Sequence, residues 1–473
     1  MSIKTGFGRL IAATMVLVLG VAVAVDTQPG IDGTWQGILG GGLRLTLHLL
    51  KAADGGLSAD LVSVDQGGAK IPVQSLSLKD QTLSLNVDAV KGQYVGKLNA
   101  TATELTGTWT QNGQSLPLNF KRNDPEPPAA RRPQDPHKPY PYREEEVSYP
   151  NTRAGIKLAG TLTLPKGAGP FPAALLITGS GKQNRDEELV GHKPFLVLSD
   201  YLTRRGIAVL RVDDRGMGGS TGDFDKATSA DFATDVLAGV SFLKARSDIR
   251  PDRIGLIGHS EGGLIAPMVA VQSPDVAFIV LMAGTSVSGE TILAAQQSMI
   301  LQANGTPEAE VHANEAALKK AFVILREESD PAKARVRLVQ SARGSAAILS
   351  NDKRADFEKS LEQEVDTLNG PWMRYFLKYD PALTLRKVTC PVLALFGELD
   401  LQVPAKLNRA PMEAALQAGG NHDYTVRVLP GLNHLFQQAK TGSPSEYGAI
   451  EETINPAALK IMGDWVDAHV QAK

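Results

Sequence analysis

The sequence predicts an α/β fold with an eight-stranded, mostly parallel sheet and a helical cap insertion, preceded by a small all-β domain. From residue 143 onward, short apolar runs alternate with helical stretches, which is typical of a parallel sheet covered by crossover helices. A charged, helix-favouring segment at about 285–385 interrupts this alternation. Before residue 123 apolar and polar residues alternate with a period of two in short segments, which indicates half-buried antiparallel strands.

Length and composition describe an ordinary globular protein. At 473 residues the chain is too long for one core and suggests two or three domains. The apolar fraction of 42%, the charged fraction of 21% and the formal charge of −2 argue against a nucleic-acid partner. The single cysteine, Cys390, lies in an apolar run and is interpreted as a small core residue.

Residues 1–25 have the pattern of an export signal. Lys4 and Arg9 form a basic start, residues 10–25 are apolar, and residues 22–24 offer small side chains for cleavage. The apolar run is shorter than the roughly 20 residues of a membrane span. We therefore expect a periplasmic or secreted protein with no stable membrane anchor after cleavage.

Residues 26–123 predict a small β-barrel or sandwich. Two short sequences, at 33–37 and 107–111, are similar and contain Trp35 and Trp109. Their similarity suggests that the first and last strands are neighbours. Both tryptophans are expected to fill the interior. A proline-rich stretch at 124–142 then predicts an extended linker, which separates this domain from residues 143–473.

The second domain contains eight strand candidates, which are interleaved with helical segments. They are residues 145–149, 156–164, 173–179, 207–212, 254–259, 277–283, 392–396 and 424–429. The insertion at about 285–385 follows the sixth strand, on the edge where active-site loops of such sheets lie. We therefore expect it to form a cap over the site rather than a solvated outgrowth.

A serine between glycines marks the predicted nucleophile. The apolar strand 254–259 ends at Ser260, and a helical pattern follows. In the G-x-S-x-G arrangement Gly258 and Gly262 permit a sharp strand-to-helix turn that exposes the serine hydroxyl. The alternative is an ordinary glycine-rich turn.

The order of the remaining polar residues predicts a base and an acid for this serine. His434 follows the last strand at the edge that carries Ser260, whereas His259 is expected to point away. After the seventh strand come Glu398 and Asp400. Asp400 lies further into the loop that must reach His434 and is the predicted acid, with Glu398 as the alternative.

The predicted oxyanion hole needs two amide N–H groups near Ser260. Glu261 supplies one, and the loop after the third strand supplies the other through Ser180, with Gly181 as the next candidate. The glycine-rich loop 213–220 lacks the ending of a phosphate loop and is interpreted as structural support for the site.

The cap contains the densest aromatic cluster in a chain with only 5% aromatic residues. Trp372, Tyr375 and Phe376 lie shortly before the strand that leads to Asp400. They either line the substrate pocket or attach the cap to the sheet by packing.

These motifs, in this order, resemble the α/β-hydrolase superfamily from residue 144 to the C-terminus. The chain is similar in particular to exported bacterial serine carboxylesterases with a small N-terminal β-domain and a helical cap. In these a Gly-Ser-Gly-x-x-x-Arg-Asp phrase, like residues 179–186, marks the oxyanion loop. Thr178 stands where many relatives carry histidine. The resemblance implies hydrolysis of carboxylic esters with short acyl chains through an acyl-enzyme.

Two other functions stay open at this point. One is acyl transfer or peptide cleavage by the same triad, and the other is a non-catalytic binding protein on the same scaffold. A small-molecule ester is the expected partner, and no cofactor or metal is expected. The sequence leaves open whether the protein forms a homo-oligomer.

Overall fold

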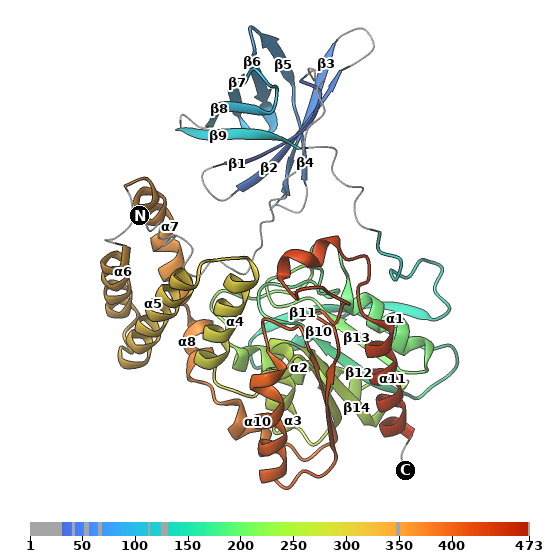
Figure 1. Cartoon of the computed structure of the whole chain (residues 1–473). Helices are drawn as coiled ribbons and strands as arrows, with labels where there is room; N and C mark the ends of the chain where they lie inside the picture. The colour runs from blue at the N-terminus through green and yellow to red at the C-terminus, as the bar shows by residue number, and fades with distance from the viewer. Residues whose placement is uncertain are drawn as a thin grey trace. The chain divides into compact units, whose positions relative to one another are not determined.

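The computed structural model describes residues 31–39, 43–51, 56–64, 69–111, 114–123, 131–346 and 351–471. Their contacts divide them into two compact units, with the boundary before Arg131 (Figure 1). The predicted export signal, residues 1–25, lies outside the described residues. No helix in the described part of the chain has both the length and the apolar character of a membrane span.

Within the described residues, the N-terminal unit is a nine-stranded antiparallel sheet in the order β4-β3-β2-β1-β9-β8-β7-β6-β5. β3, near one end of the sheet, approaches β5 at the other end, so the sheet curls into a half-barrel. The predicted small all-β domain is thus confirmed. The strands are β1 Gly33–Leu39, β2 Leu43–Lys51, β3 Leu57–Ser63, β4 Ala69–Pro72, β5 Ser75–Lys79, β6 Thr82–Val87, β7 Gly92–Leu98, β8 Glu104–Gln111 and β9 Gln114–Asn123.

Both tryptophans of this unit lie in its core. Trp35 is fully buried and its indole N–H donates to the carbonyl oxygen of Ile31 at 2.9 Å, while Trp109 is 3% exposed. The first and last strands, β1 and β9, are paired neighbours as predicted. The second of the two similar sequences, however, lies on β8, and β9 separates it from β1. Both tryptophans lie in the same core, although their strands do not pair.

The second unit, in its described residues, contains an eight-stranded sheet in the order β10-β11-β13-β12-β14-β15-β16-β17. The pairs β10–β11 and β11–β13 are antiparallel and all others are parallel. This confirms the predicted mostly parallel, eight-stranded sheet. The strands are β10 Arg143–Asn151, β11 Ile156–Leu164, β12 Phe171–Ile177, β13 Ala208–Val212, β14 Ile249–His259, β15 Val276–Met282, β16 Val392–Gly397 and β17 Tyr424–Leu429.

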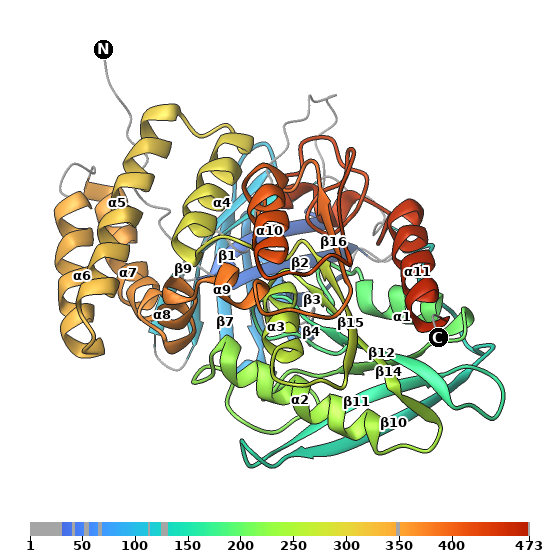
Figure 2. The same ribbon diagram turned by 90° about the horizontal axis from the view of Figure 1, so that it is seen from below.

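Helices cover both faces of this sheet, which explains the apolar runs in its central strands. α1 (Pro194–Arg204) and α11 (Pro456–Gln471) pack together on one face, and α2 (Ser229–Lys244), α3 (Glu261–Ala270) and α10 (Ala405–Ala418) cover the other (Figure 2). The last six residues of β14 are all buried. β14 begins at Ile249, earlier than predicted, because Ile249 pairs with Phe171 before a polar stretch.

The segment between β15 and β16 folds into helices, as predicted for the insertion. α5, α6 and α7 stack beside one another away from the sheet, and α4 and α8 connect them to it (Figure 2). The helices have a core of their own, which includes Leu318, Phe322 and Leu338. They are α4 Gly289–Ala303, α5 Glu308–Glu327, α6 Pro331–Ala346, α7 Asn351–Leu368, α8 Pro371–Lys378 and α9 Pro381–Leu385.

The second half of the predicted linker belongs to the second unit. The Arg132 guanidinium donates to the backbone carbonyl oxygens of Val190 at 3.0 Å, Gly191 at 3.2 Å, Gly448 at 3.0 Å and Ile450 at 2.9 Å. Gln134 bonds to the backbone of residues 453 and 454. The proline content of the linker predicts an extended backbone. It does not predict that the Arg132 guanidinium, with its several N–H donors, attaches the linker to the second unit.

Candidate active site

Ser260 occupies a strained turn between β14 and α3. Its φ of 53° and ψ of −113° are rare for a residue with a side chain. The turn is tight enough to need both flanking glycines, since a Cβ on Gly258 would lie 2.1 Å from the carbonyl oxygen of Gly262. A Cβ on Gly262 would lie 2.1 Å from the carbonyl oxygen of Ile177. The local structure is therefore the sharp strand-to-helix turn that the motif predicts.

His434 and Asp400 are hydrogen-bonded to each other in the loops that follow β17 and β16. His434 Nδ1 lies 2.8 Å from Asp400 Oδ2, and both side chains are almost completely buried. The other carboxylate oxygen, Asp400 Oδ1, accepts the amides of Gln402 and Val403, each at 2.8 Å. These bonds hold the carboxylate in the orientation that meets the imidazole.

Glu398, the alternative acid, has another partner. Its Oε2 accepts the Gly431 amide at 2.9 Å, so it connects the two loops rather than orienting His434. Of the two predicted candidates, the structure brings Asp400 to His434. Because β14, β16 and β17 are parallel neighbours or near neighbours, Ser260, Asp400 and His434 all follow carboxyl ends at one edge of the sheet.

The predicted oxyanion loop lies against the nucleophile turn. A Cβ on Gly179 would lie 3.3 Å from Ser260 Cβ. The Gly179 amide donates to Glu187 Oε1 at 2.7 Å and is therefore occupied, whereas Ser180 and Gly181 follow on the exposed part of the loop. Glu261 is the first residue of α3, where an amide has no carbonyl acceptor within the helix.

The loop after β13 supports this arrangement, as the sequence predicts for residues 213–220. Asp214 Oδ1 accepts the Thr178 hydroxyl at 2.7 Å, and Asp214 Oδ2 accepts the Gln183 amide at 2.8 Å. Asp213 forms an ion pair with Arg185 at 2.7 Å. The oxyanion loop is thus held at both of its ends by carboxylates of a neighbouring strand's loop.

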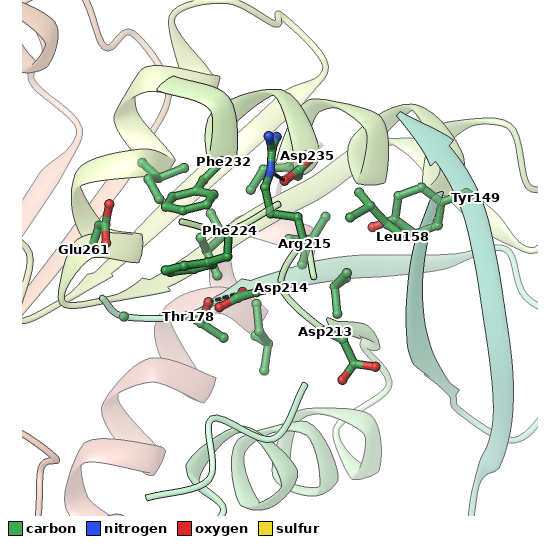
Figure 3. A pocket seen from close by; sticks show the side chains of 17 residues that line it. Tyr149, Leu158, Thr178, Asp213, Asp214, Arg215, Phe224, Phe232, Asp235 and Glu261 are labelled. Carbon is green, nitrogen blue, oxygen red and sulfur yellow. Dashed lines mark hydrogen bonds and ion pairs between the residues drawn. The ribbon is translucent and has the colours of Figure 1, made fainter. Parts of the chain in front are cut away.

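A small cavity of about 50 Å³ lies behind the nucleophile turn, between the sheet and α2 (Figure 3). Thr178, Asp214, Glu261, Phe224 and Phe232 point toward it from four different segments. Burial raises the pKa of Asp214 to about 7, against the effect of its hydrogen bonds from Thr178 and Gln183. No cluster of three or more His, Cys, Asp or Glu side chains that could hold a metal ion occurs in the described residues.

Glu261 connects the nucleophile turn to the cap. Its buried Oε1 accepts the Ser229 hydroxyl and the Trp372 indole N–H, both at 2.6 Å. Burial raises the pKa of the Glu261 carboxyl, and the two hydrogen bonds oppose that rise. The residue whose amide is a predicted oxyanion donor is therefore held by its own side chain to helix α8.

The cap aromatics are mostly engaged in packing. Trp372 stacks on Phe376 with ring centroids 5.1 Å apart, and Phe376 is 7% exposed within the main core. Tyr375 is half-buried and stacks on Tyr379 at 5.7 Å. Of the two interpretations, these contacts favour attachment of the cap, and contact with substrate stays a prediction.

Two further residues, Glu187 and His259, lie at the site, although the sequence pattern predicts no role for either. His259 is buried, and its ring lies 4.8 Å from that of His434, between Glu187 Oε1 and the His434 carbonyl oxygen. The sequence predicts that His259 points away from Ser260 along the strand, and the structure places its ring beside that of His434. Nothing in the sequence connects residues 187 and 259, so only the fold reveals the contact.

Comparison with known proteins identifies the family. The model of the X-Pro dipeptidyl-peptidase (S15) family matches residues 154–409, which is more than half of the chain. The chain belongs to the S15 family. It therefore stands among the hydrolases, with the α/β-hydrolase fold that the sheet order shows.

Among curated relatives of this S15 family member, the esterase EstD of Thermotoga maritima is 27% identical over 294 residues, which is 61% of either chain. The putative hydrolase YtaP of Bacillus subtilis is 36% identical over 120 residues, covering 21% of this chain and 39% of YtaP. The chain thus spans less than two thirds of the length of either relative.

Two solved structures also resemble this S15 family member. The α/β hydrolase GrgF from Penicillium covers 70% of this chain and all of its own, with 17% identity and a TM-score of 0.43. The Pyrococcus furiosus esterase Pf2001 covers 70% of this chain and 91% of its own, with 13% identity and a TM-score of 0.40.

Proposed function

We propose that this protein is a serine hydrolase that cleaves carboxylic esters with short acyl chains. The observation that carries the proposal is the buried 2.8 Å contact between His434 and Asp400, at the sheet edge where Ser260 stands on its strained turn. A nucleophile, a base and an acid that fixes the base's tautomer are the parts that such chemistry needs.

In the proposed reaction, the Ser260 hydroxyl attacks the ester carbonyl while His434 Nε2 accepts its proton. Asp400 holds the Nδ1–H of His434 and stabilises the imidazolium that forms. The amides of Glu261 and of Ser180, or of Gly181, stabilise the oxyanion. His434 then protonates the leaving alcohol, and a water molecule, activated by His434, releases the acid from the acyl-enzyme and restores the Ser260 hydroxyl.

Two findings support different substrate classes. One curated relative, EstD, is called an esterase, which favours esters. The matching family is described as X-Pro dipeptidyl-peptidase, so peptide cleavage by the same triad is the second candidate. Comparing p-nitrophenyl esters of increasing acyl length with an X-Pro p-nitroanilide distinguishes them, and an added alcohol acceptor reveals acyl transfer.

The mechanism is tested by Ser260→Ala. We expect turnover to fall by about 10⁴-fold or more while the melting temperature changes little, because only a hydroxyl is removed. A fluorophosphonate should label the wild type and not this variant. Ser241→Ala, an exposed serine on α2, is the matched control and should retain labelling and turnover. Near wild-type turnover in Ser260→Ala would exclude the proposed mechanism, and His434→Ala should lose about as much as Ser260→Ala.

A further inference from the structure

A chain of buried hydrogen bonds connects the oxyanion loop to the loop of His434. Glu187 Oε1 accepts the Gly179 amide at 2.7 Å and lies 3.0 Å from His259 Nδ1. On the other side of the same ring, His259 Nε2 donates to the carbonyl oxygen of His434 at 3.0 Å. His259 immediately precedes Ser260, so the chain passes beside the nucleophile.

The partners of His259 determine its charge. The His434 carbonyl can only accept a hydrogen bond, so Nε2 must carry a hydrogen. Glu187 Oε1 already accepts the Gly179 amide, which suits a carboxylate, and Nδ1 must then carry a hydrogen as well. A ring with hydrogens on both nitrogens is an imidazolium. The hydrogen-bond geometry therefore favours a buried ion pair, with His259 and Glu187 each 5% exposed.

The surroundings favour this charge. Burial lowers the pKa of His259, but the charge and hydrogen bond of Glu187 outweigh it, so that the pKa is raised. The His434 carbonyl and the more distant Asp400 carboxylate act in the same direction. The other groups that face the ring are the His434 imidazole, at 4.8 Å between centroids, and the Phe436 ring, at 6.4 Å.

We propose that Glu187 and His259 are positioning residues, and that their ion pair holds the oxyanion loop and His434 in register with Ser260. This inference rests on the proposed function. The two residues are not catalytic themselves, since Glu187 acts through the Gly179 amide and His259 acts through the His434 backbone. Preorganised donors and a correctly placed base are what lower the barrier in such a site, and small displacements are costly.

The two residues before Glu187 are also anchored by ion pairs. Arg185 Nη2 bonds to Asp213 Oδ2 at 2.7 Å, and Asp186 forms an ion pair with the buried Arg211. Glu187 itself has a φ of 52°, a conformation that favours glycine. Three consecutive side chains therefore attach the oxyanion loop to β13, its following loop and β14, and Glu187 is the one that reaches the catalytic serine's neighbour.

The ion pair predicts a specific kinetic pattern. Glu187→Gln and His259→Gln should each lower kcat for a short p-nitrophenyl ester by about 10- to 100-fold with little change in KM, because substrate still binds while its oxyanion and base are misplaced. The double variant should lose much less than the product of the two single losses, because neither partner is left as an unpaired buried charge.

The pH profile distinguishes positioning from a general loss of stability. His259→Gln removes a cation whose ring lies 4.8 Å from that of His434, while the Glu187 carboxylate remains, and this change favours the protonated form of a neighbouring base. The acidic limb of kcat/KM should therefore move to higher pH in His259→Gln and return toward the wild-type position in the double variant. Arg246→Gln is the matched control. It breaks an ion pair with Asp248 at the opposite edge of the sheet, where β14 begins, and should leave the limb unmoved.

A measurement that does not depend on turnover completes the test. In wild-type protein with ¹⁵N-labelled histidine, the resonances absent from His259→Gln should show both ring nitrogens protonated at pH 8. A neutral ring at that pH, additive losses in the double variant, or an unmoved limb in His259→Gln would overturn the proposal. Failure of a fluorophosphonate to label Ser260 in the wild type would instead overturn the proposed function, and the NMR result would still stand.

Discussion

Asp400 and Glu398 are two residues apart, yet the structure gives them different partners. Asp400 meets His434 at 2.8 Å, whereas Glu398 accepts the Gly431 amide. We expect Asp400→Asn to lower kcat by about 10⁴-fold, because an amide cannot hold the imidazole in the required tautomer or stabilise its cation. Glu398→Gln should cost little in kcat, since a glutamine oxygen can still accept the Gly431 amide. Steady-state kinetics with one ester checks both, and the reverse ranking would transfer the acid's role to Glu398.

The raised pKa of Asp214 predicts that the stability of the folded protein depends on pH. Its pKa rises from 3.8 to about 7 on folding, chiefly because the carboxyl is buried. Between these pH values the folded protein binds more protons at this site than the unfolded chain does, so its contribution to stability falls as pH rises through this window. Below pH 4 both states are protonated, and above pH 7 the full cost of burying the carboxylate remains.

We therefore expect the free energy of unfolding of the wild type, relative to Asp214→Asn, to be higher at pH 5 than at pH 8. The difference should be on the order of 2–4 kcal/mol, measured by urea unfolding at both values. The asparagine also loses one of two accepted hydrogen bonds, but that loss is the same at each pH. A constant gap between the two proteins would show that Asp214 does not titrate in this range.

At the scale of elements, helix α8 is attached to the nucleophile turn through one hydrogen bond. Trp372→Phe removes the indole N–H that Glu261 accepts, yet retains a ring that can stack on Phe376. We expect this variant to change the preferred acyl length, because α8 is no longer held above Glu261, with a loss of about 1–3 kcal/mol in stability. Rates across p-nitrophenyl esters and thermal melting measure the two effects.

Tyr379→Phe is the control for Trp372→Phe, because it removes one hydrogen bond to Thr384 but retains the ring that stacks on Tyr375 and leaves the Glu261 contact intact. Its acyl preference should match that of the wild type. If Trp372→Phe also keeps the wild-type order of esters and only melts earlier, its bond to Glu261 serves stability alone, and the predicted role of Trp372 in acyl preference is wrong.

At the scale of the whole molecule, the two units have separate cores, and the boundary lies before Arg131. A chain of residues 131–473 should therefore fold and retain ester hydrolysis close to that of the full protein. A chain of residues 143–473 lacks the bonds of Arg132 and Gln134 to the backbone of the hydrolase unit. We expect it to melt several degrees lower, as calorimetry of the two truncated chains would show. Equal melting temperatures would mean that residues 131–142 add nothing to the stability of this unit.

Much of the hydrolase unit follows from the sequence alone, because its elements are local. Strands such as β11 and β17 match their predicted bounds to the residue, because each is a short run rich in apolar and β-branched residues. The order of Ser260, Asp400 and His434 after three strands is enough to predict one shared edge, because parallel strands end on the same side of a sheet. The small all-β domain is likewise predicted, as a barrel or sandwich, by period-two alternation.

Only the tertiary structure decided which polar groups meet across that edge. The choice between Asp400 and Glu398 depends on where two loops turn, and periodicity contains no information about loop geometry. Glu187 and His259 are 72 residues apart and meet because β12 and β14 are adjacent in the sheet, although another strand lies between them in the chain. Arg132 likewise joins the hydrolase unit through carbonyl oxygens near residues 190 and 450. Such contacts form between residues distant in sequence, so their partners become visible only once the chain has folded.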